Sequence, residues 1–297
     1  MNLTKSIVKS VLRRLVGYRA KKLRQLRAMK KLRQLRAINN PTADKIANAI
    51  HDALKNNLDP EEKKWVDRIE GKRRVLNSSS TRISITDFGA GKPNLARTED
   101  EMYQGVTRDT TVGETCRIAS KPYFWSLLLF KLIREFKPSN SIELGTCLGI
   151  SGAYQASAQK LNKSGRLITL EGAESLVSLA EKNFQQLGLD NAHVVSGRFQ
   201  DNLDRVLTEN KPIDFAFIDG HHDEKATISY FEKFVPHLSK NSIIVFDDIS
   251  WSDGMRRAWK NIERNKAVKM SLDLGVIGIC VLDENIDENY NLRIPMF

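Results

Sequence analysis

The chain has 297 residues, about the length of two average domains, and its 41% hydrophobic and 28% charged residues are ordinary for a soluble globular protein. These proportions exclude wholesale disorder, and the longest apolar run, residues 123–130, is far shorter than the ~18 residues of a membrane span. The three cysteines, Cys116, Cys147 and Cys280, form no C-x-x-C pair. This pattern argues against a disulfide scaffold or a structural zinc site and favours a reducing compartment, so we expect a cytoplasmic protein.

The net charge of +11 is concentrated at the N-terminus. Residues 1–40 contain 13 Lys or Arg and no Asp or Glu, which leaves 34 basic and 36 acidic residues in the rest of the chain. The sequence therefore predicts a near-neutral globular body with a basic arm. Any electrostatic partner belongs to the arm and not to the whole protein.

The arm contains a tandem nonapeptide repeat, in which Lys21–Met29 (KKLRQLRAM) is followed at once by Lys30–Ile38 (KKLRQLRAI). Its residues are strong helix formers, so we expect a helix. The large apolar residues recur every third position, and at that spacing they wind around a helix without forming a single stripe: Leu23, Leu26, Met29, Leu32, Leu35 and Ile38. An earlier set shares one helical face at i, i+4 spacing: Leu3, Ile7, Val11 and Leu15.

A basic amphipathic helix of this kind can lie on an anionic membrane, bind nucleic acid or serve as an organelle transit peptide. A membrane contact would make the protein peripheral to that membrane. The alternative is a solvated helical extension without a partner. The helical N-terminal region is also a candidate for a homodimer contact.

Two helices are predicted after the arm, over residues 42–55 and 60–75, the second with Pro60 just inside its start. Residues 78–113 are polar and contain glycine, which predicts a flexible loop. We expect residues 41–113 to cover the active site. A further helix, dense in apolar residues, is predicted over 121–136.

Within this loop, Asp87-Phe88-Gly89-Ala90-Gly91 resembles a nucleotide-binding glycine loop. Lys92-Pro93-Asn94 follows where a cofactor-binding helix would have to start, so a flexible loop is the better interpretation.

From residue 139 the pattern alternates between strands and helices. Strands are predicted over residues 141–144, 167–170, 192–196, 213–218, 243–246, 268–274 and 276–282, and helices over 150–161, 176–187, 225–238 and 254–263. This order predicts an α/β fold with a Rossmann-like, doubly wound, mostly parallel seven-stranded sheet and an antiparallel edge strand. Such sheets bind ligands beyond the carboxyl ends of their strands.

The turn after the first strand has the features of a ligand-binding turn. Gly145 and Gly149 allow the backbone to approach a ligand, but their G-x-x-x-G spacing differs from that of dinucleotide-binding folds. Glu143, two residues earlier, would repel a pyrophosphate and favour a cationic ligand. Glu171 ends the second strand, where a carboxylate can accept hydrogen bonds from both ribose hydroxyls.

Three carboxylates follow two strands that should be neighbours in the sheet. Asp219 ends the fourth strand, and Asp247 and Asp248 end the fifth. This much negative charge needs a cation, and hard oxygen ligands suit Mg²⁺. The alternative is that one or two of these acids cap helices and that His221 or His222 is merely solvated.

Five motifs occur together between residues 121 and 282: ELGTCLGIS, LEG, GRFQDNL, FIDGHH and VFDDI. In this order they resemble the class I S-adenosylmethionine-dependent methyltransferases. The stretch is most similar to metal-dependent O-methyltransferases of the catechol, caffeoyl-coenzyme A and macrolide-sugar types. The resemblance implies three regions: a basic arm (1–40), a helical and loop cap (41–113) and a methyltransferase domain (114–297).

The resemblance also implies a cofactor site made of Glu143, Gly145, Thr146, Gly149, Ser151, Glu171, Gly172, Gln200 and Asp219. In this site Glu143, Gly145 and Ser151 would contact the methionine part of the cofactor. Glu171 would bind the ribose, and Gln200 would lie at the adenine edge.

For catalysis, the resemblance implies that Asp219, Asp247 and Asp248 bind Mg²⁺ and that Asp219 also takes part in the reaction. The catechol type has Asn at the last of these positions and a basic Lys three residues after the first. This chain has Asp248 at the last position. Three residues after Asp219 it has His222, as in the sugar-modifying relatives. We therefore expect His222 to be the general base for a small-molecule acceptor of sugar, polyketide or phenolic type.

Other functions are compatible with parts of the sequence. The protein could methylate a macromolecular or membrane-bound acceptor, with the arm as a tether. It could also bind the cofactor or a partner without catalysis, although such a module has no need of the acids and His222 together. A dehydrogenase is disfavoured by the glycine spacing. Trp251 is suited either to stack on an aromatic or sugar acceptor or simply to pack.

Overall fold

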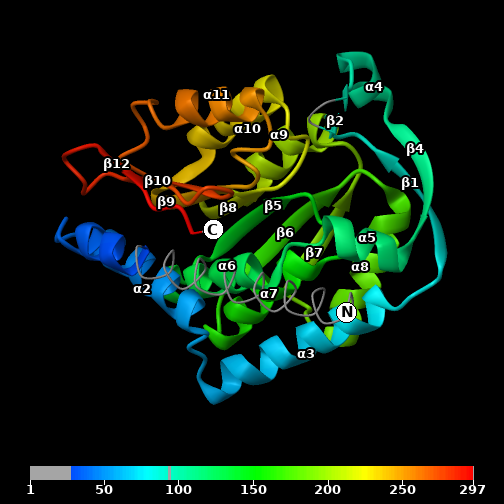
Figure 1. The fold of residues 1–297 in the computed structure, drawn as a ribbon, viewed down its shortest axis with the longest axis horizontal. Helices are drawn as coiled ribbons and strands as arrows, with labels where there is room; N and C mark the ends of the chain where they lie inside the picture. Colours follow the sequence, from blue (N-terminus) through cyan, green and yellow to red (C-terminus); the bar gives the residue numbers. More distant parts are fainter. Residues whose placement is uncertain (1–27, 93–94, 297) are drawn as a thin grey trace, which may run out of the picture.

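The computed structural model describes residues 28–92 and 95–296, and its centre is an eight-stranded sheet (Figure 1). The strand order is β12-β10-β11-β9-β8-β5-β6-β7, in which the five strands from β9 to β7 are parallel. The strands are β5 (Asn140–Leu144), β6 (Arg166–Glu171), β7 (Ala192–Ser196), β8 (Ile213–Ile218), β9 (Leu238–Phe246), β10 (Met270–Asp273), β11 (Gly278–Asp283) and β12 (Tyr290–Arg293).

The predicted α/β fold class is confirmed, with one strand more than expected. The antiparallel hairpin of β10 and β11 is present, and β11 is also antiparallel to β9. The additional strand, β12, pairs in parallel with β10 and forms the sheet edge. It is short and lies in a polar part of the sequence, where no clear apolar pattern predicts a strand.

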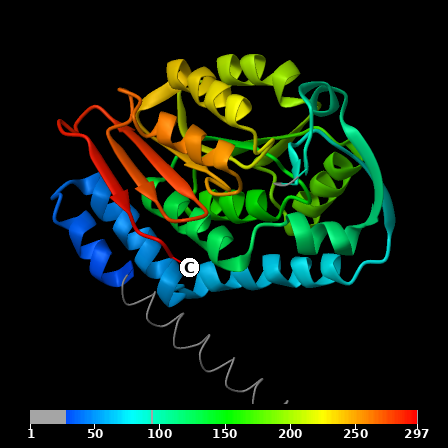
Figure 2. The same cartoon turned by 45° about the horizontal axis from the view of Figure 1, so that its top comes forward.

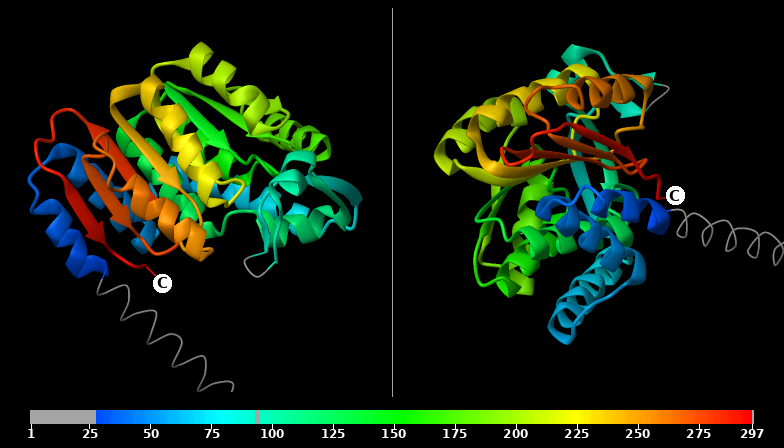
Figure 3. Two further views of the ribbon diagram at one scale, coloured as in Figure 1. Left: turned by 90° about the horizontal axis from the view of Figure 1, so that it is seen from above. Right: turned by 90° about the vertical axis from the view of Figure 1, so that its left-hand side faces the viewer.

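Helices cover both faces of the sheet (Figures 1 and 3). Side chains alternate along each strand, so that Phe217 and Val245 belong to one hydrophobic core, and Ile218 and Phe246 belong to the other. The first core lies under α6 (Tyr123–Phe136), α7 (Ile150–Leu161) and α8 (Glu174–Leu187), and the second under α9 (Phe199–Asn210), α10 (Glu224–Phe234) and α11 (Asp253–Ile262). The short 3-10 helix η1 (Val235–His237) leads into β9.

The two helices predicted after the arm are confirmed as α2 (Pro41–Lys55) and α3 (Pro60–Asn77). Asn40 caps α2, and Asp59 and Glu62 form a capping box at the start of α3. Helix α2 packs on α6, and α3 packs on α7, so both form an outer layer on one side of the molecule (Figures 1 and 2).

The described part of the arm is integrated into the globular body. Residues 28–36 are helical, and Ala28, Leu32 and Leu35 are buried in the first core. The predicted lack of a single apolar stripe is therefore wrong for this part, because the small Ala28 completes an i, i+4, i+7 stripe with the two leucines. Lys31 Nζ also donates to the carbonyl of Arg293. A solvated extension is thus excluded for residues 28–36.

The upstream amphipathic face and the first leucines of the repeat lie outside the described residues: Leu3, Ile7, Val11, Leu15, Leu23 and Leu26. The membrane, nucleic-acid and dimer contacts of the arm stay predictions. No helix in the described ranges has the length and apolarity needed to cross a bilayer.

The segment predicted as a flexible loop forms a two-stranded ribbon instead. Strands β1 (Arg82–Asp87) and β4 (Val106–Thr111) pair antiparallel over six residues each. The connection holds the short pair β2 (Gly91–Lys92) and β3 (Leu95–Ala96) and the helix α4 (Glu99–Gln104), and α5 (Val112–Ala119) follows the ribbon. The loop prediction failed because Ile85 is the only residue of β1 that is fully buried, which makes the apolar alternation weak.

Candidate functional site

A cavity of about 610 Å³ opens at the carboxyl ends of β5, β6, β8 and β9. This is the place where a doubly wound sheet binds its ligands. The strand ends form one wall. The opposite wall comes from the end of β1 and the turn after it (residues 87–91) and from the end of α5 and its connection to α6 (residues 117–122). No residue of α2 or α3 lines the cavity, so the ribbon and α5 cover the site and the expectation that residues 41–75 do so is wrong.

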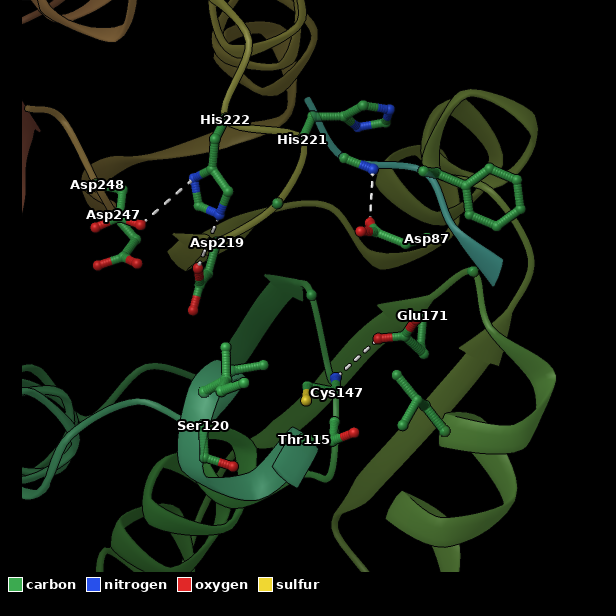
Figure 4. Close-up of a pocket in the computed structure, with 18 of the residues that line it drawn as sticks. Asp87, Thr115, Ser120, Cys147, Glu171, Asp219, His221, His222, Asp247 and Asp248 are labelled. Carbon is green, nitrogen blue, oxygen red and sulfur yellow. Dashed lines mark hydrogen bonds and ion pairs between the residues drawn. The ribbon is translucent and has the colours of Figure 1, made fainter. Parts of the chain in front are cut away.

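The turn after β5 brings the backbone to the floor of the cavity. Gly145 has a φ of 102°, and a Cβ on this residue would lie 2.0 Å from the carbonyl oxygen of Asp219. Only glycine allows the ends of β5 and β8 to approach this closely. Cys147 follows with a φ of 49°, and its N–H donates to Glu171 Oε2 at 2.8 Å (Figure 4).

Glu171 at the end of β6 is held in place by the backbone. Its Oε1 accepts from the N–H of Ala173 at 2.9 Å, while Oε2 accepts from Cys147. Burial raises the pKa of this carboxyl group, and the hydrogen bonds from the backbone oppose that rise. A carboxylate fixed in this way, with its side chain on the cavity wall, is suited to accept hydrogen bonds from paired hydroxyl groups.

The turn after β1 closes over Glu171. A Cβ on Gly172 would lie 2.7 Å from the Phe88 ring, so the ring packs directly on the Gly172 backbone. Asp87 accepts from the N–H of Gly89 and pairs with Arg97 at 3.1 Å. The glycine-containing turn after β1 therefore does line the cavity, although no helix starts there and it is not a dinucleotide-binding loop.

The three predicted metal ligands converge at the other end of the cavity, as Figure 4 shows. Lys121, just before α6, lies among them. Its Nζ is 3.2 Å from Asp219 Oδ2 and also donates to Asp247 Oδ2. The exposed fractions of the Lys121 and Asp247 side chains are only 10% and 0%. The excess negative charge predicted from the sequence is thus partly neutralised by the chain itself.

The pKa values of this cluster follow from burial and charge. Burial lowers the pKa of Lys121, but Asp219 and Asp247 raise it more, so the amine stays protonated. Burial and the charge of Asp247 raise the pKa of Asp219. Burial would also raise the pKa of Asp247, yet the Lys121 ammonium holds it below its ordinary value.

The two adjacent histidines have different environments. His222 Nε2 lies 3.6 Å from Asp219 Oδ1, its Nδ1 lies 4.0 Å from Asp248 Oδ2, and its ring centre is 6.1 Å from that of Trp251. His221 instead contacts Tyr230, whose hydroxyl is 2.5 Å from its Nδ1, and burial lowers its pKa to about 4. Of the two histidines, His222 is therefore the one that lies within 4.0 Å of carboxylates of the acid cluster.

Strained backbone gathers around this cavity. Four of its lining residues are not glycine and yet have a positive φ: Cys147, His221, His222 and Asp248. Such conformations cost of the order of 1 kcal/mol each, and they cluster at functional sites because the surrounding structure holds side chains where the chemistry needs them.

The structure brings together seven of the residues predicted for the site: Gly145, Glu171, Gly172, Asp219, His222, Asp247 and Asp248. The others do not line the cavity: Glu143, Thr146, Gly149, Ser151 and Gln200. Glu143 is fully buried behind the turn, where it accepts from Gln155 and Thr169, and Gln200 is exposed on α9. Their contacts with a cofactor stay predictions.

The lining residues that sequence reasoning missed include Lys121, Cys147 and Phe88. Cys147 lies inside the motif ELGTCLGIS. It contacts Glu171 through its backbone N–H, and a pattern of side chains does not predict a backbone contact. Phe88 lies in the glycine-containing turn of residues 87–91, whose sequence predicts a flexible loop because no helix is expected to follow it. Lys121 is separated from Asp247 by 126 positions, and no local pattern connects the two.

The acid cluster does not fit a resident magnesium ion in this arrangement. Mg²⁺ needs near-octahedral oxygen ligands at about 2.1 Å. Here the oxygens of Asp219 and Asp247 that face each other are both bound to Lys121. Among residues 28–92 and 95–296, no three His, Cys, Asp or Glu side chains are placed to hold a metal ion.

Comparison with known proteins gives a matching result. Residues 142–249 match the family model described as a methyltransferase domain. This stretch carries the Gly145 turn, Glu171 and all three acids. The fold agrees with that of an SAH-bound methyltransferase from Podospora anserina, with a TM-score of 0.50 at 16% identity over 56% of this chain and 81% of that one.

Two further relatives carry O-methyltransferase names. A catechol O-methyltransferase from Niastella koreensis is 34% identical over 112 residues, which are 37% of this chain and 49% of that protein. The chain thus spans about half the length of this curated relative. An O-methyltransferase from Bacillus cereus in complex with SAH is 24% identical, with a TM-score of 0.48, over 55% of this chain and 83% of that one.

Proposed function

We propose that the protein is an S-adenosylmethionine-dependent O-methyltransferase that acts on a hydroxyl group of a small molecule. One observation carries the proposal. A single cavity holds the fixed Glu171 carboxylate at one end and His222 beside Asp219 at the other, with the Gly145 turn between them (Figure 4). The match of residues 142–249 to a methyltransferase domain supports the same activity.

The residues around the turn fit this cofactor. Glu171 can accept hydrogen bonds from both ribose hydroxyls, because its own oxygens are oriented by backbone N–H groups. At Gly145 a side chain would collide with the backbone of Asp219, so the backbone is bare where a ligand must approach closely. Bound S-adenosylmethionine supplies an activated methyl group: the acceptor oxygen bonds to the methyl carbon, the carbon–sulfur bond breaks, and S-adenosylhomocysteine is released.

His222 removes the proton of the acceptor hydroxyl in this proposal. A histidine can accept a proton near neutral pH and is well suited to general base catalysis. Asp219, 3.6 Å from Nε2, and Asp248, 4.0 Å from Nδ1, stabilise the imidazolium that forms. The strained backbone at His222 keeps the ring between these carboxylates.

A small acceptor with a ring is supported by the mouth of the cavity. Trp251 is 38% exposed and Ile118 is 70% exposed, and both line the cavity; the Trp251 ring centre is 6.1 Å from that of His222. An exposed indole beside the base offers a flat surface for a phenolic, sugar or polyketide ring. The name of the Niastella koreensis relative, a catechol O-methyltransferase, supports a phenolic member of this group. Magnesium is not part of the proposal, because Lys121 occupies the acid cluster.

Isothermal titration with S-adenosylmethionine tests the cofactor. We expect micromolar binding to the wild type and a loss of about tenfold or more in Glu171→Ala, because hydrogen bonds to a charged group contribute about 1.5–3 kcal/mol each. The matched control is Glu174→Ala, an exposed carboxylate three residues away that does not line the cavity. If the wild type binds no S-adenosylmethionine, the proposal is wrong.

Methyl transfer is then measured with a panel of phenols, sugars and polyketides. Transfer to a hydroxyl group of any of these compounds would support the small-molecule acceptor. Cofactor binding combined with transfer only to a macromolecule would replace that part of the proposal.

A further inference from the structure

Lys121 joins three segments of the chain that lie far apart in the sequence. It lies between α5 and α6, and it contacts Asp219 at the end of β8 and Asp247 at the end of β9. All three side chains line the cavity and are at least four-fifths buried. A lysine is seldom buried unless its charge has a partner, so this position needs both carboxylates.

The charges in the cluster also limit what else can bind there. Asp247 is fully buried, and one of its oxygens, Oδ1, has no hydrogen-bond partner among the described residues. The other oxygen is bound to Lys121, whose ammonium group is also 3.2 Å from Asp219. A divalent cation between these carboxylates would have to displace the ammonium group. If both stayed, two positive charges would lie side by side in a largely buried site and repel each other.

We propose that the ammonium group of Lys121 takes the place of a divalent cation in this site and binds the acceptor oxygen during methyl transfer. The inference rests on the proposed function. An ammonium group has three N–H donors. Asp247 accepts from one of them and Asp219 lies at ion-pair distance, which leaves at least one donor for an oxygen in the cavity. Its positive charge stabilises the negative charge that develops on the oxygen as His222 takes the proton, and Lys121 keeps its own protons throughout.

This role differs from a purely structural one in what it predicts. If Lys121 only neutralised the two acids, its removal would weaken folding, and added metal would not restore turnover. If it replaces a metal ion, its removal leaves the carboxylates of Asp219 and Asp247 without the cation that both of them contact. That vacated site should bind a divalent ion and recover part of the lost activity.

The first measurement is the binding of Mn²⁺ to the wild type and to Lys121→Ala, followed by electron paramagnetic resonance. We expect no Mn²⁺ bound at the site in the wild type and one equivalent bound in Lys121→Ala. The matched control is Lys225→Ala, a largely exposed lysine that pairs with Glu99, and this variant should behave as the wild type does. One equivalent of Mn²⁺ bound to the wild-type protein would overturn the proposal.

The second measurement is turnover in the presence of EDTA and of added Mg²⁺. Wild-type turnover should not change with EDTA. Lys121→Ala should lose about a hundredfold in turnover, and Mg²⁺ should restore part of it; Lys121→Arg should lose less, because the charge is kept. Loss of wild-type turnover in EDTA, or a folded Lys121→Ala variant that binds no Mn²⁺, would contradict the inference.

The outcomes separate this inference from the proposed function. If the wild type binds no S-adenosylmethionine, the proposed methyltransferase activity is refuted. Mn²⁺ that binds to Lys121→Ala but not to the wild type would still show that Lys121 occupies the cation site. Removal of Lys121 leaves buried carboxylates unpaired and endangers folding. If Lys121→Ala does not fold, the measurements on the wild-type protein decide. Mn²⁺ bound to the wild type overturns the inference, and wild-type turnover that resists EDTA supports it.

Discussion

Glu143 is a completely buried carboxyl group two residues before Gly145, which lines the cavity. Its Oε1 accepts from Gln155 Nε2 at 2.8 Å, and its Oε2 accepts from Thr169 Oγ1 at 2.7 Å. Burial raises the pKa of Glu143 from its ordinary 4.5 to about 7, although these hydrogen bonds oppose the rise. In the unfolded chain the group is solvated and regains its ordinary pKa.

The sign of the effect on stability follows from these two pKa values. The folded protein binds the proton of Glu143 more tightly than the unfolded chain does. The contribution of this group to stability is therefore complete below about pH 4.5 and is lost as the pH rises through about 7. The difference between the two values corresponds to about 3 kcal/mol of unfolding free energy.

The replacement Glu143→Gln keeps the shape of the side chain and one acceptor oxygen but removes the titration. We expect the unfolding free energy of the wild type, measured relative to this variant, to fall by about 3 kcal/mol between pH 4.5 and pH 7. Urea unfolding followed by circular dichroism at several pH values measures this difference. At the upper end of the range the variant should be the more stable protein.

The matched control is Ser141→Ala on the same strand. Ser141 is buried and accepts from Gln159 Nε2 at 2.9 Å, but it does not titrate in this range. Its stability difference from the wild type should be the same at every pH. A difference between the wild type and Glu143→Gln that is equally constant would refute the reasoning.

Two further predictions concern the turn and the base. Gly145→Ala should destabilise the protein by about 3 kcal/mol in the same urea titration and abolish cofactor binding. The control Gly188 also has a positive φ, but no atom lies within 4 Å of a Cβ built on it. Gly188→Ala should therefore cost only about 1 kcal/mol. His222→Ala should keep the S-adenosylmethionine affinity and lose about a hundredfold in turnover. The control His193→Ala, at an exposed histidine, should change neither the affinity nor the turnover. Unchanged turnover in His222→Ala would remove His222 from the mechanism.

Most of the sheet could be predicted because its central strands are buried on both faces. The last four residues of β8 and of β9 form continuous apolar runs, and helices alternate with the parallel strands, so the boundaries of α7 were predicted to the residue. The ends of these strands also place Glu171, Asp219 and Asp247 in one cavity, since parallel strands share a carboxyl edge. The topology alone was therefore enough to bring these residues together.

The ribbon and the arm show where burial is decided by distant parts of the chain. Strand β1 does alternate, with Ile83 and Ile85 on one side, but only Ile85 is fully buried, and the polar residues between them suggested a loop. In the arm, Leu32 and Leu35 are buried in the first core beside Ala28, and Lys31 donates to a carbonyl of β12. No local pattern specifies that neighbour, because β12 comes more than 250 residues later.

The acid cluster shows what the sequence leaves open at the site. Three carboxylates at adjacent strand ends need positive charge nearby. The sequence could not say where that charge comes from, because a lysine just before α6, 126 positions from Asp247, supplies part of it in the folded chain. Lys121 is one of many lysines in the sequence, and only the folded chain shows that it is buried between Asp219 and Asp247. Acidic residues that a fold brings together therefore predict a cation, and whether it is a metal depends on whether the chain itself places an ammonium group among them.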